Sequence, residues 1–251
     1  MVGPLSYIGG KNRLAPRIIE ILPKHTTYVE AFAGGAQVLF HKEPSAVEVL
    51  NDIDGEIVNF FRVCQWHHEE LIRYFRFALV SRASFDLQKA TDPATLTDIQ
   101  RAARYFYLLK NSFASLVRHP NYHWHVVQRP GFNLERLPEL LENAHKRLER
   151  VQIECLPYEQ IFNRFDRKET LFYADPPYWN RSLYRYNFTT TDFTNLEKRL
   201  RTLKGKFVLS LNDLPEVRAL FHRFRIHEVE LPYTAQKQSG RRYREVLITN
   251  F

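Results

Sequence analysis

The clearest chemical signal in the chain is the run Asp175-Pro176-Pro177-Tyr178. It follows an apolar stretch at residues 171–174, so we expect it at the carboxyl end of a central strand, where open α/β sheets place their ligands. A carboxylate at Asp175 and the carbonyl of Pro176 can accept the two N–H bonds of an amine whose lone pair is delocalised into a ring. The lone pair is then free to point at a methyl donor.

The rest of this motif suits the same chemistry. The ring of each proline locks φ, which fixes the direction of the Pro176 carbonyl. Tyr178 offers a flat face on which an extruded base can stack. The alternative is a structural Asp-Pro-Pro turn after a buried strand, but the preceding strand and the aromatic residue favour a functional loop.

A second group of residues is typical of a site for a nucleoside-containing ligand. Glu30 and Phe32 lead into Gly34-Gly35, and consecutive glycines between a strand and a helix allow a ligand to approach the backbone closely. Asp52 ends the next strand, where a carboxylate can accept hydrogen bonds from ribose hydroxyls. Asp54 is a neighbouring candidate, although it could equally cap the helix that follows it.

Near the N-terminus, Tyr7 and Gly9-Gly10-Lys11 form a third motif. By itself, a Gly-Gly-Lys turn before a helix could be no more than a helix start with a solvated lysine.

Taken together and in order, YIGGK, EAFAGGA, LNDID and DPPYW resemble the motifs of Dam-type, α-group N6-adenine DNA methyltransferases. The resemblance implies transfer of a methyl group from S-adenosylmethionine to adenine N6 in duplex DNA by base flipping, with no metal. It also implies a class I methyltransferase (Rossmann-like) α/β sheet. Ala31 and Ala36 depart from the family pattern, where proline and a third glycine are common.

The resemblance further implies the roles of individual residues. The implied contacts with S-adenosylmethionine are Tyr7, Lys11, Asp52 and Asp175, with Glu30, Phe32, Gly34 and Gly35 lining the same pocket. The implied DNA-binding stretch is residues 111–118, which contains Asn111, Ser112, Phe113 and Arg118. In this stretch Ala114 and Ser115 replace the Asn-Gly that the family often has.

Two basic stretches are candidates for contact with DNA. Arg118 and Arg129 flank a segment rich in histidines and aromatic residues, which can read base edges or fill the gap left by a flipped base. Lys237, Arg241 and Arg242 crowd a loop between the last two strands, where phosphate contact and a solvated hairpin tip are equally good interpretations. The histidines lack spaced carboxylate or cysteine partners, so we expect no metal site.

The elements that position these residues alternate at both ends of the chain. Residues 14–22, 27–32, 34–40, 46–50 and 57–64 read as helix, strand, helix, strand and helix. Strand patterns return at residues 151–155, 170–175, 206–212, 225–231 and 244–249, with helices predicted at 195–203 and 215–221. The last two strands have only a loop between them, which predicts an antiparallel hairpin.

The middle of the chain contrasts with both ends, because helical patterns at residues 68–80, 99–110 and 137–151 have no strand between them. We therefore predict a catalytic domain formed by residues 1–65 and 151–251, with residues 66–150 as a helical insert that recognises the target DNA.

The overall composition agrees with a partner that is a polyanion. The 36 Lys and Arg residues outnumber the 28 Asp and Glu residues, which gives a net charge of +8. Clustered cations bind phosphates by displacing condensed counterions. With no long apolar run, the sequence predicts a protein without a membrane span, located in the cytoplasm and associated with the nucleoid through DNA binding. We expect a monomer or a dimer on DNA. The two cysteines, Cys64 and Cys155, are predicted to be buried free thiols.

Three alternatives to this reading stay open at the level of sequence. The first is the same chemistry on cytosine N4, although those enzymes more often begin the catalytic motif with serine. The second is methylation of adenine in RNA, which the helical insert disfavours. The third is a non-catalytic DNA-binding protein on the same scaffold, which the intact Lys11, Asp52, Asp175 and Tyr178 disfavour.

Overall fold

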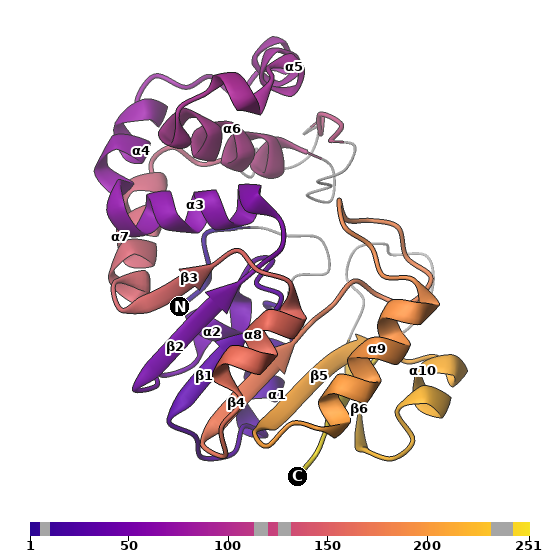
Figure 1. Cartoon of the computed structure of the whole chain (residues 1–251). Coiled ribbons are helices and arrows are strands. Elements are labelled where there is room, and N and C mark those ends of the chain that lie inside the picture. Colours follow the sequence, from indigo (N-terminus) through magenta and orange to yellow (C-terminus); the bar gives the residue numbers. More distant parts are fainter. Residues whose placement is uncertain (6–10, 113–119, 125–131, 232–242) are drawn as a thin grey trace.

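The computed structural model describes residues 1–5, 11–112, 120–124, 132–231 and 243–251. Its centre is a seven-stranded sheet in the order β3-β2-β1-β4-β5-β7-β6 (Figure 1). The strands are β1 (Thr27–Glu30), β2 (Val47–Asn51), β3 (Val151–Glu154), β4 (Thr170–Ala174), β5 (Lys206–Asn212), β6 (Arg225–Leu231) and β7 (Tyr243–Thr249). This order, with five parallel strands, confirms the predicted class I methyltransferase sheet.

Both faces of the sheet are buried, which explains why its central strands are continuous apolar runs. Along β4, Leu171 and Tyr173 pack into one core, and Phe172 and Ala174 pack into the other. The helices α8 (Tyr158–Phe165), α9 (Thr190–Arg201) and α10 (Pro215–Leu220) cover the second face, and α1 (Ala15–Glu20) and α2 (Gln37–His41) cover the first (Figure 1).

The end of the sheet is antiparallel, as predicted. β7 lies between β5 and β6 and runs antiparallel to both, with Asn212 opposite Glu245. The last strand therefore inserts next to a central strand and brings its first residues to the carboxyl end of β5. Helix α8, which connects β3 to β4, was not predicted.

The middle of the chain is helical, with some differences from the prediction. It contains α4 (His68–Phe75), α5 (Arg82–Ala90), a short 3-10 helix (Pro93–Thr95), α6 (Asp98–Asn111) and α7 (Leu137–Leu148). The predicted helix at 68–80 is too long, because α4 stops at Phe75 and leaves Phe77 and Leu79 exposed. Helix α5 was missed, although Ser81 accepts a hydrogen bond from Ser84 N and caps it.

These helices pack on α3 (Gly55–Trp66), which leads out of the first half of the sheet. The ring of Phe60 in α3 stacks on Phe106 of α6, with centroids 5.4 Å apart and planes 1° from parallel. Buried residues of α3, α6, α7 and the sheet belong to one continuous core. The insert is therefore joined to the sheet by packing as well as by the chain.

Two other predictions can be compared with the structure. Cys64 is buried as expected, and burial raises the pKa of its thiol, but Cys155 is exposed, so the prediction was wrong for that residue. Among the described residues, no helix has the length and apolar character needed to cross a membrane.

Candidate active site

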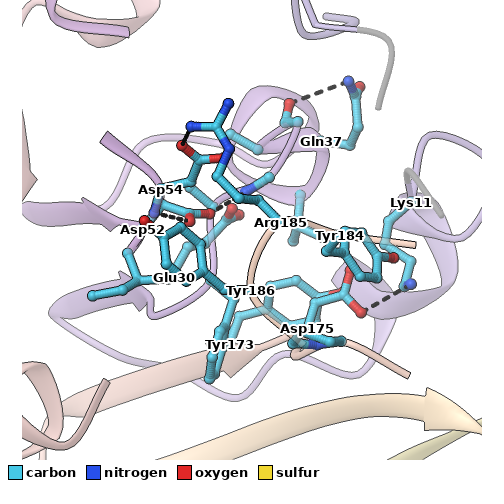
Figure 2. Close-up of a pocket in the computed structure, with 18 of the residues that line it drawn as sticks. Lys11, Glu30, Gln37, Asp52, Asp54, Tyr173, Asp175, Tyr184, Arg185 and Tyr186 are labelled. Carbon is cyan, nitrogen blue, oxygen red and sulfur yellow. Dashed lines mark hydrogen bonds and ion pairs between the residues drawn. The ribbon is translucent and has the colours of Figure 1, made fainter. Parts of the chain in front are cut away.

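A pocket opens at the carboxyl ends of β1, β2 and β4, where the three motifs predicted from sequence converge (Figure 2). Strand order explains this, because β1 lies between β2 and β4 and all three run parallel. The pocket is lined by predicted residues from each motif, namely Lys11, Glu30, Phe32, Gly34, Gly35, Asp52, Asp175 and Pro177. Pro176 and Tyr178 lie beside the pocket and are not part of its lining.

The catalytic motif leaves the end of β4 and is fixed to the neighbouring strand. Trp179 N donates to Asn212 Oδ1 at 3.1 Å, and Asn212 Nδ2 donates back to the Trp179 carbonyl at 3.2 Å. Asn212 is the last residue of β5, so this reciprocal pair of hydrogen bonds holds the loop against the carboxyl end of β5. The loop thereby presents Asp175 to the pocket.

Lys11 lies at the centre of the charged groups around this loop. Its Nζ is 2.9 Å from Asp175 Oδ1 and 3.6 Å from Glu245 Oε2, and it also donates to the hydroxyl of Tyr178. The ammonium group lies 4.5 Å from the centroid of the Tyr178 ring. Burial opposes the charge on Lys11, but the carboxylates of Asp175 and Glu245 outweigh it and raise the pKa of this lysine.

Asp175 is the carboxylate that the catalytic hypothesis requires, and its environment raises its pKa toward neutrality. Burial raises its pKa to about 6, against the opposing effect of Lys11. Its side chain is 20% exposed, on the side of the pocket. A carboxylate that is ionised at neutral pH, held by a lysine and open to a pocket, can accept a hydrogen bond from an amine.

The glycine turn and Asp52 form the other half of the pocket. Gly34 N donates to Asp52 Oδ2, and Asp54 N donates to Asp52 Oδ1, each at 2.9 Å. Burial raises the pKa of Asp52 to about 6, which these two hydrogen bonds oppose. Gly34 has a φ of 46°, and Ala36, where the family often has glycine, has a φ of 50°. The turn therefore keeps the left-handed backbone even at the alanine.

Asp54 has the alternative role that the sequence allowed, because it accepts a hydrogen bond from Glu56 N and caps α3. It also forms an ion pair with Arg185, 3.1 Å from Arg185 Nη1 to Asp54 Oδ1 (Figure 2). Arg185 belongs to the segment after the catalytic motif. The pair therefore joins that segment to the start of α3 beside the pocket.

Glu30 lines the pocket, but its carboxylate is turned toward the protein. Tyr28 Oη and Leu39 N donate to Glu30 Oε1 at 2.8 and 2.6 Å, and the residue is 1% exposed. Burial raises its pKa to about 8. These contacts tie β1 to α2 and make Glu30 a support of the glycine turn.

Sequence reasoning missed several residues of this pocket. Tyr184, Arg185, Tyr186 and Phe188 reach it from the segment that follows the catalytic motif, and Figure 2 shows Tyr184 next to Asp175 and Lys11. Ile53 was also missed, and the available signal in the sequence was an apolar residue between Asp52 and Asp54; in the structure it lines the pocket and is 40% exposed. Phe32 packs edge-on against Phe188, with centroids 5.7 Å apart.

Several predicted residues lie outside the described part of the chain, and their roles stay predictions. They are Tyr7, Gly9, Gly10, Phe113, Arg118, Arg129, Lys237, Arg241 and Arg242. Asn111 and Ser112 are described, and both are buried. Asn111 Nδ2 donates to the Tyr107 carbonyl at 2.9 Å, so this side chain holds the end of α6 and does not face solvent.

The described residues contain no group of three or more His, Cys, Asp or Glu side chains placed to hold a metal ion. His123 and Trp124 of the histidine-rich stretch are described, and Trp124 is 63% exposed.

Comparison with known proteins gives a family match across most of the chain. The family model of D12 class N6 adenine-specific DNA methyltransferases matches residues 7–235. A type II methyltransferase of Lactococcus lactis subsp. cremoris is 26% identical over 271 residues, covering 98% of this chain and 94% of that protein. The DNA adenine methylase of Escherichia coli (strain K12) is 23% identical over 262 residues, covering 95% and 90%. The DNA N-6-adenine-methyltransferase of Escherichia phage P1 is 27% identical over 236 residues, covering 86% of this chain and 30% of that protein.

Proposed function

Because this chain belongs to the family of D12 class N6 adenine-specific DNA methyltransferases, we propose that Asp175 presents the adenine amine for methylation beside a pocket that binds S-adenosylmethionine. The enzyme methylates adenine N6 in DNA, and the proposal concerns which residues do this. One observation carries it: Asp175, paired with Lys11, opens onto the pocket that Asp52 and the Gly34 turn also line.

The lining of the pocket matches the chemistry of the methyl donor. Asp52 is held by two backbone N–H groups, and its remaining lone pairs can accept hydrogen bonds from ribose hydroxyls. Phe32, Ile53 and Phe188 supply apolar surface for a purine ring. When bound, S-adenosylmethionine supplies an electrophilic methyl group on a sulfonium.

On the acceptor side, the protein mainly positions the base. The adenine amine is a weak nucleophile, because its lone pair is delocalised into the ring. The Asp175 carboxylate and the Pro176 carbonyl accept its two N–H bonds, which directs the lone pair out of the ring plane and toward the methyl group. Tyr178 supplies a stacking face for the extruded base.

We propose duplex DNA as the partner and residues 66–150 as the part that recognises it. The net charge of +8 and the exposed Trp124 beside Arg82, 5.6 Å from guanidinium to ring centroid, support this assignment. In this proposal Arg118 and Arg129 of the insert contact bases, and Lys237, Arg241 and Arg242, in the loop between the last two strands, contact phosphates. We further propose that the protein acts in the cytoplasm, as a monomer or as a dimer on DNA, and associates with the nucleoid through DNA.

Replacing Asp175 with asparagine tests the catalytic part of the proposal. Asparagine keeps the size of the side chain but removes the negative charge of the group that accepts the N–H bond of the amine. We therefore expect the rate of methyl transfer to fall about 10²–10³-fold. Transfer of labelled methyl groups to DNA, followed by nucleoside analysis, measures both the rate and the modified base.

Asp192→Asn is the matched control, because Asp192 forms the capping box of α9 with Thr189 and is not part of the pocket lining, so its replacement should leave the rate unchanged. An Asp175→Asn enzyme that makes N6-methyladenine at the wild-type rate would refute the role of Asp175. Label on cytosine would refute the substrate, and label on RNA alone would refute the partner.

A further inference from the structure

Glu245 is a carboxylate next to the catalytic motif that neither the sequence motifs nor the mechanism above uses. It lies near the start of β7, opposite Asn212 at the end of β5, and is 9% exposed. Ser210 Oγ donates to its Oε2 at 3.3 Å, and Lys11 Nζ lies 3.6 Å from the same oxygen. The carboxylate also interacts with the hydroxyl of Tyr178, and this interaction helps to raise the pKa of that hydroxyl.

A charge at this place is costly unless it has a function or partners. Leu247 and Thr249 share its face of β7 and are buried, so an apolar residue would extend that face at no desolvation cost. Besides Ser210, Glu245 interacts with Lys11 and Tyr178. Lys11 pairs with Asp175, and Tyr178 belongs to the catalytic motif. The position of Glu245 therefore has a consequence for the catalytic group.

The consequence is that two carboxylates share the charge of Lys11. Lys11 Nζ is 2.9 Å from Asp175 and 3.6 Å from Glu245. With Glu245 present, Lys11 does not neutralise Asp175 alone, and the second negative charge raises the pKa of Asp175. Asp175 consequently stays a better hydrogen-bond acceptor than it would be in an isolated pair with lysine.

The second contact acts on the aromatic residue of the motif. The Tyr178 hydroxyl accepts a hydrogen bond from Lys11 and also interacts with Glu245, so the two groups around it come from opposite ends of the chain. This arrangement fixes the ring next to the loop that presents Asp175.

We propose that Glu245 is a positioning residue for methyl transfer, which shares Lys11 with Asp175 and anchors the hydroxyl of Tyr178. The proposal rests on the role of Asp175 given above. It adds a residue from β7, the last strand along the chain, to a site whose other residues come from the ends of β1, β2 and β4, from Lys11 and from residues 184–188.

The test is the pH dependence of kcat in the full-length enzyme carrying Glu245→Gln. Glutamine keeps the shape of the side chain and can still accept a hydrogen bond from Tyr178. It removes the second negative charge, so Lys11 then pairs with Asp175 alone. We expect kcat to fall about tenfold and the acidic limb of the profile to move about one unit toward lower pH. The ionisable described groups around Asp175 that could contribute to the profile are Lys11, Glu30, Tyr173, Tyr178, Tyr184 and Glu245.

Glu197→Gln is the matched control, because Glu197 is buried on α9 and pairs with Arg201 outside the pocket. It should change neither kcat nor the acidic limb. Glu245→Asp keeps the charge but shortens the side chain. We expect it to lose the contact with Tyr178, and so to lower kcat while leaving the acidic limb in place, which also tests the proposal should the glutamine variant fold poorly.

Three outcomes would overturn the inference. For Glu245→Gln they are an acidic limb that stays in place or moves to higher pH, and an unchanged kcat. For Glu245→Asp it is a loss of kcat that a lower melting temperature fully accounts for. Failure of the underlying mechanism is recognised separately, because Asp175→Asn, assayed alongside, would then keep the wild-type rate.

Discussion

Two carboxyl groups of the pocket, Asp52 and Asp175, are buried enough that desolvation outweighs their hydrogen bonds and raises the pKa of each to about 6. Both are strong hydrogen-bond acceptors at both oxygens only when ionised, because protonation turns one oxygen into a donor. Because their pKa values are raised, the active form predominates above about pH 6 and is lost as the pH falls through that value. Glu30, whose pKa burial raises to about 8, accepts hydrogen bonds in the interior and is not required as a charge.

The first prediction follows from the upward direction of these two pKa shifts. We expect kcat/KM for methyl transfer to be constant at neutral pH and to fall below about pH 6, by about tenfold per unit for one group and more steeply if both must be ionised. Initial rates between pH 5 and 8, with DNA and donor subsaturating, measure the profile. A limb near pH 4, the ordinary range of aspartate, would contradict the burial argument.

The second prediction separates Asp52 from its neighbour. Asp52→Asn leaves the donor ribose without a charged acceptor, so we expect its affinity for S-adenosylmethionine to weaken by about 1–3 kcal/mol. Asp54→Asn keeps a capping side chain at α3 and should weaken donor binding less. Isothermal titration calorimetry of both variants gives the comparison, and equal or reversed effects would assign the ribose to Asp54.

Individual residues differed in how far the sequence could place them. Lys11, Asp52 and Asp175 occur in motifs whose chemistry and order predict one site, and the structure brings the three to one pocket. Glu245 could not be predicted in this way, because its place depends on β7 inserting between β5 and β6. Local patterns contain no information about that register.

Among the elements, the strands were the best predicted, since apolar runs of five or six residues bounded by turns have few alternatives. The helices of the middle were harder. The apolar residues Phe77 and Leu79 extend the pattern of α4, yet they are exposed, because the chain turns at Arg76 and starts α5 after Ser81. Segment 184–188 was unpredictable as part of the pocket, because it has no regular periodicity.

That segment gives a prediction at the scale of an element. The pair of Arg185 and Asp54 joins it to α3 beside the pocket, and Arg185 is 44% exposed, so the pair is partly screened by water. We expect Arg185→Gln to release the segment and speed donor dissociation about two- to fivefold, as for the loss of about 0.5–1 kcal/mol.

Stopped-flow displacement of the bound donor measures this rate. Arg164→Gln is the matched control, because Arg164 pairs with Glu154 at 3.7 Å and lies outside the pocket lining. Equal dissociation rates for wild type and Arg185→Gln would show that the pair does not hold the segment over the donor.

At the scale of the whole molecule, the helical insert and the sheet share one core. Phe60 of α3 stacks on Phe106 of α6, and Gln65 of α3 donates to the carbonyls of Leu148 and Val151, where α7 returns the chain to β3. The division into two parts, predicted from the change of pattern near residues 66 and 150, therefore does not correspond to two separate cores. If residues 66–150 recognise DNA as proposed, that part is coupled by direct contact to the pocket proposed for the donor.

The last prediction tests this coupling with two of the three tryptophans of the chain. Trp124 reports on the insert, where it packs edge-on against Tyr122, and Trp179 reports on the catalytic loop, where its ring lies 4.5 Å from that of Phe193. In variants that keep only one of these two tryptophans, we expect urea unfolding followed by fluorescence to give coincident midpoints. S-adenosylmethionine at about 100 times its Kd should raise the free energy of unfolding by about 2.7 kcal/mol with either probe, because the ligand binds only the folded chain and the shared core unfolds as one unit. A Trp124 transition that precedes the Trp179 transition and ignores the donor would show instead that the insert unfolds independently of the site it serves.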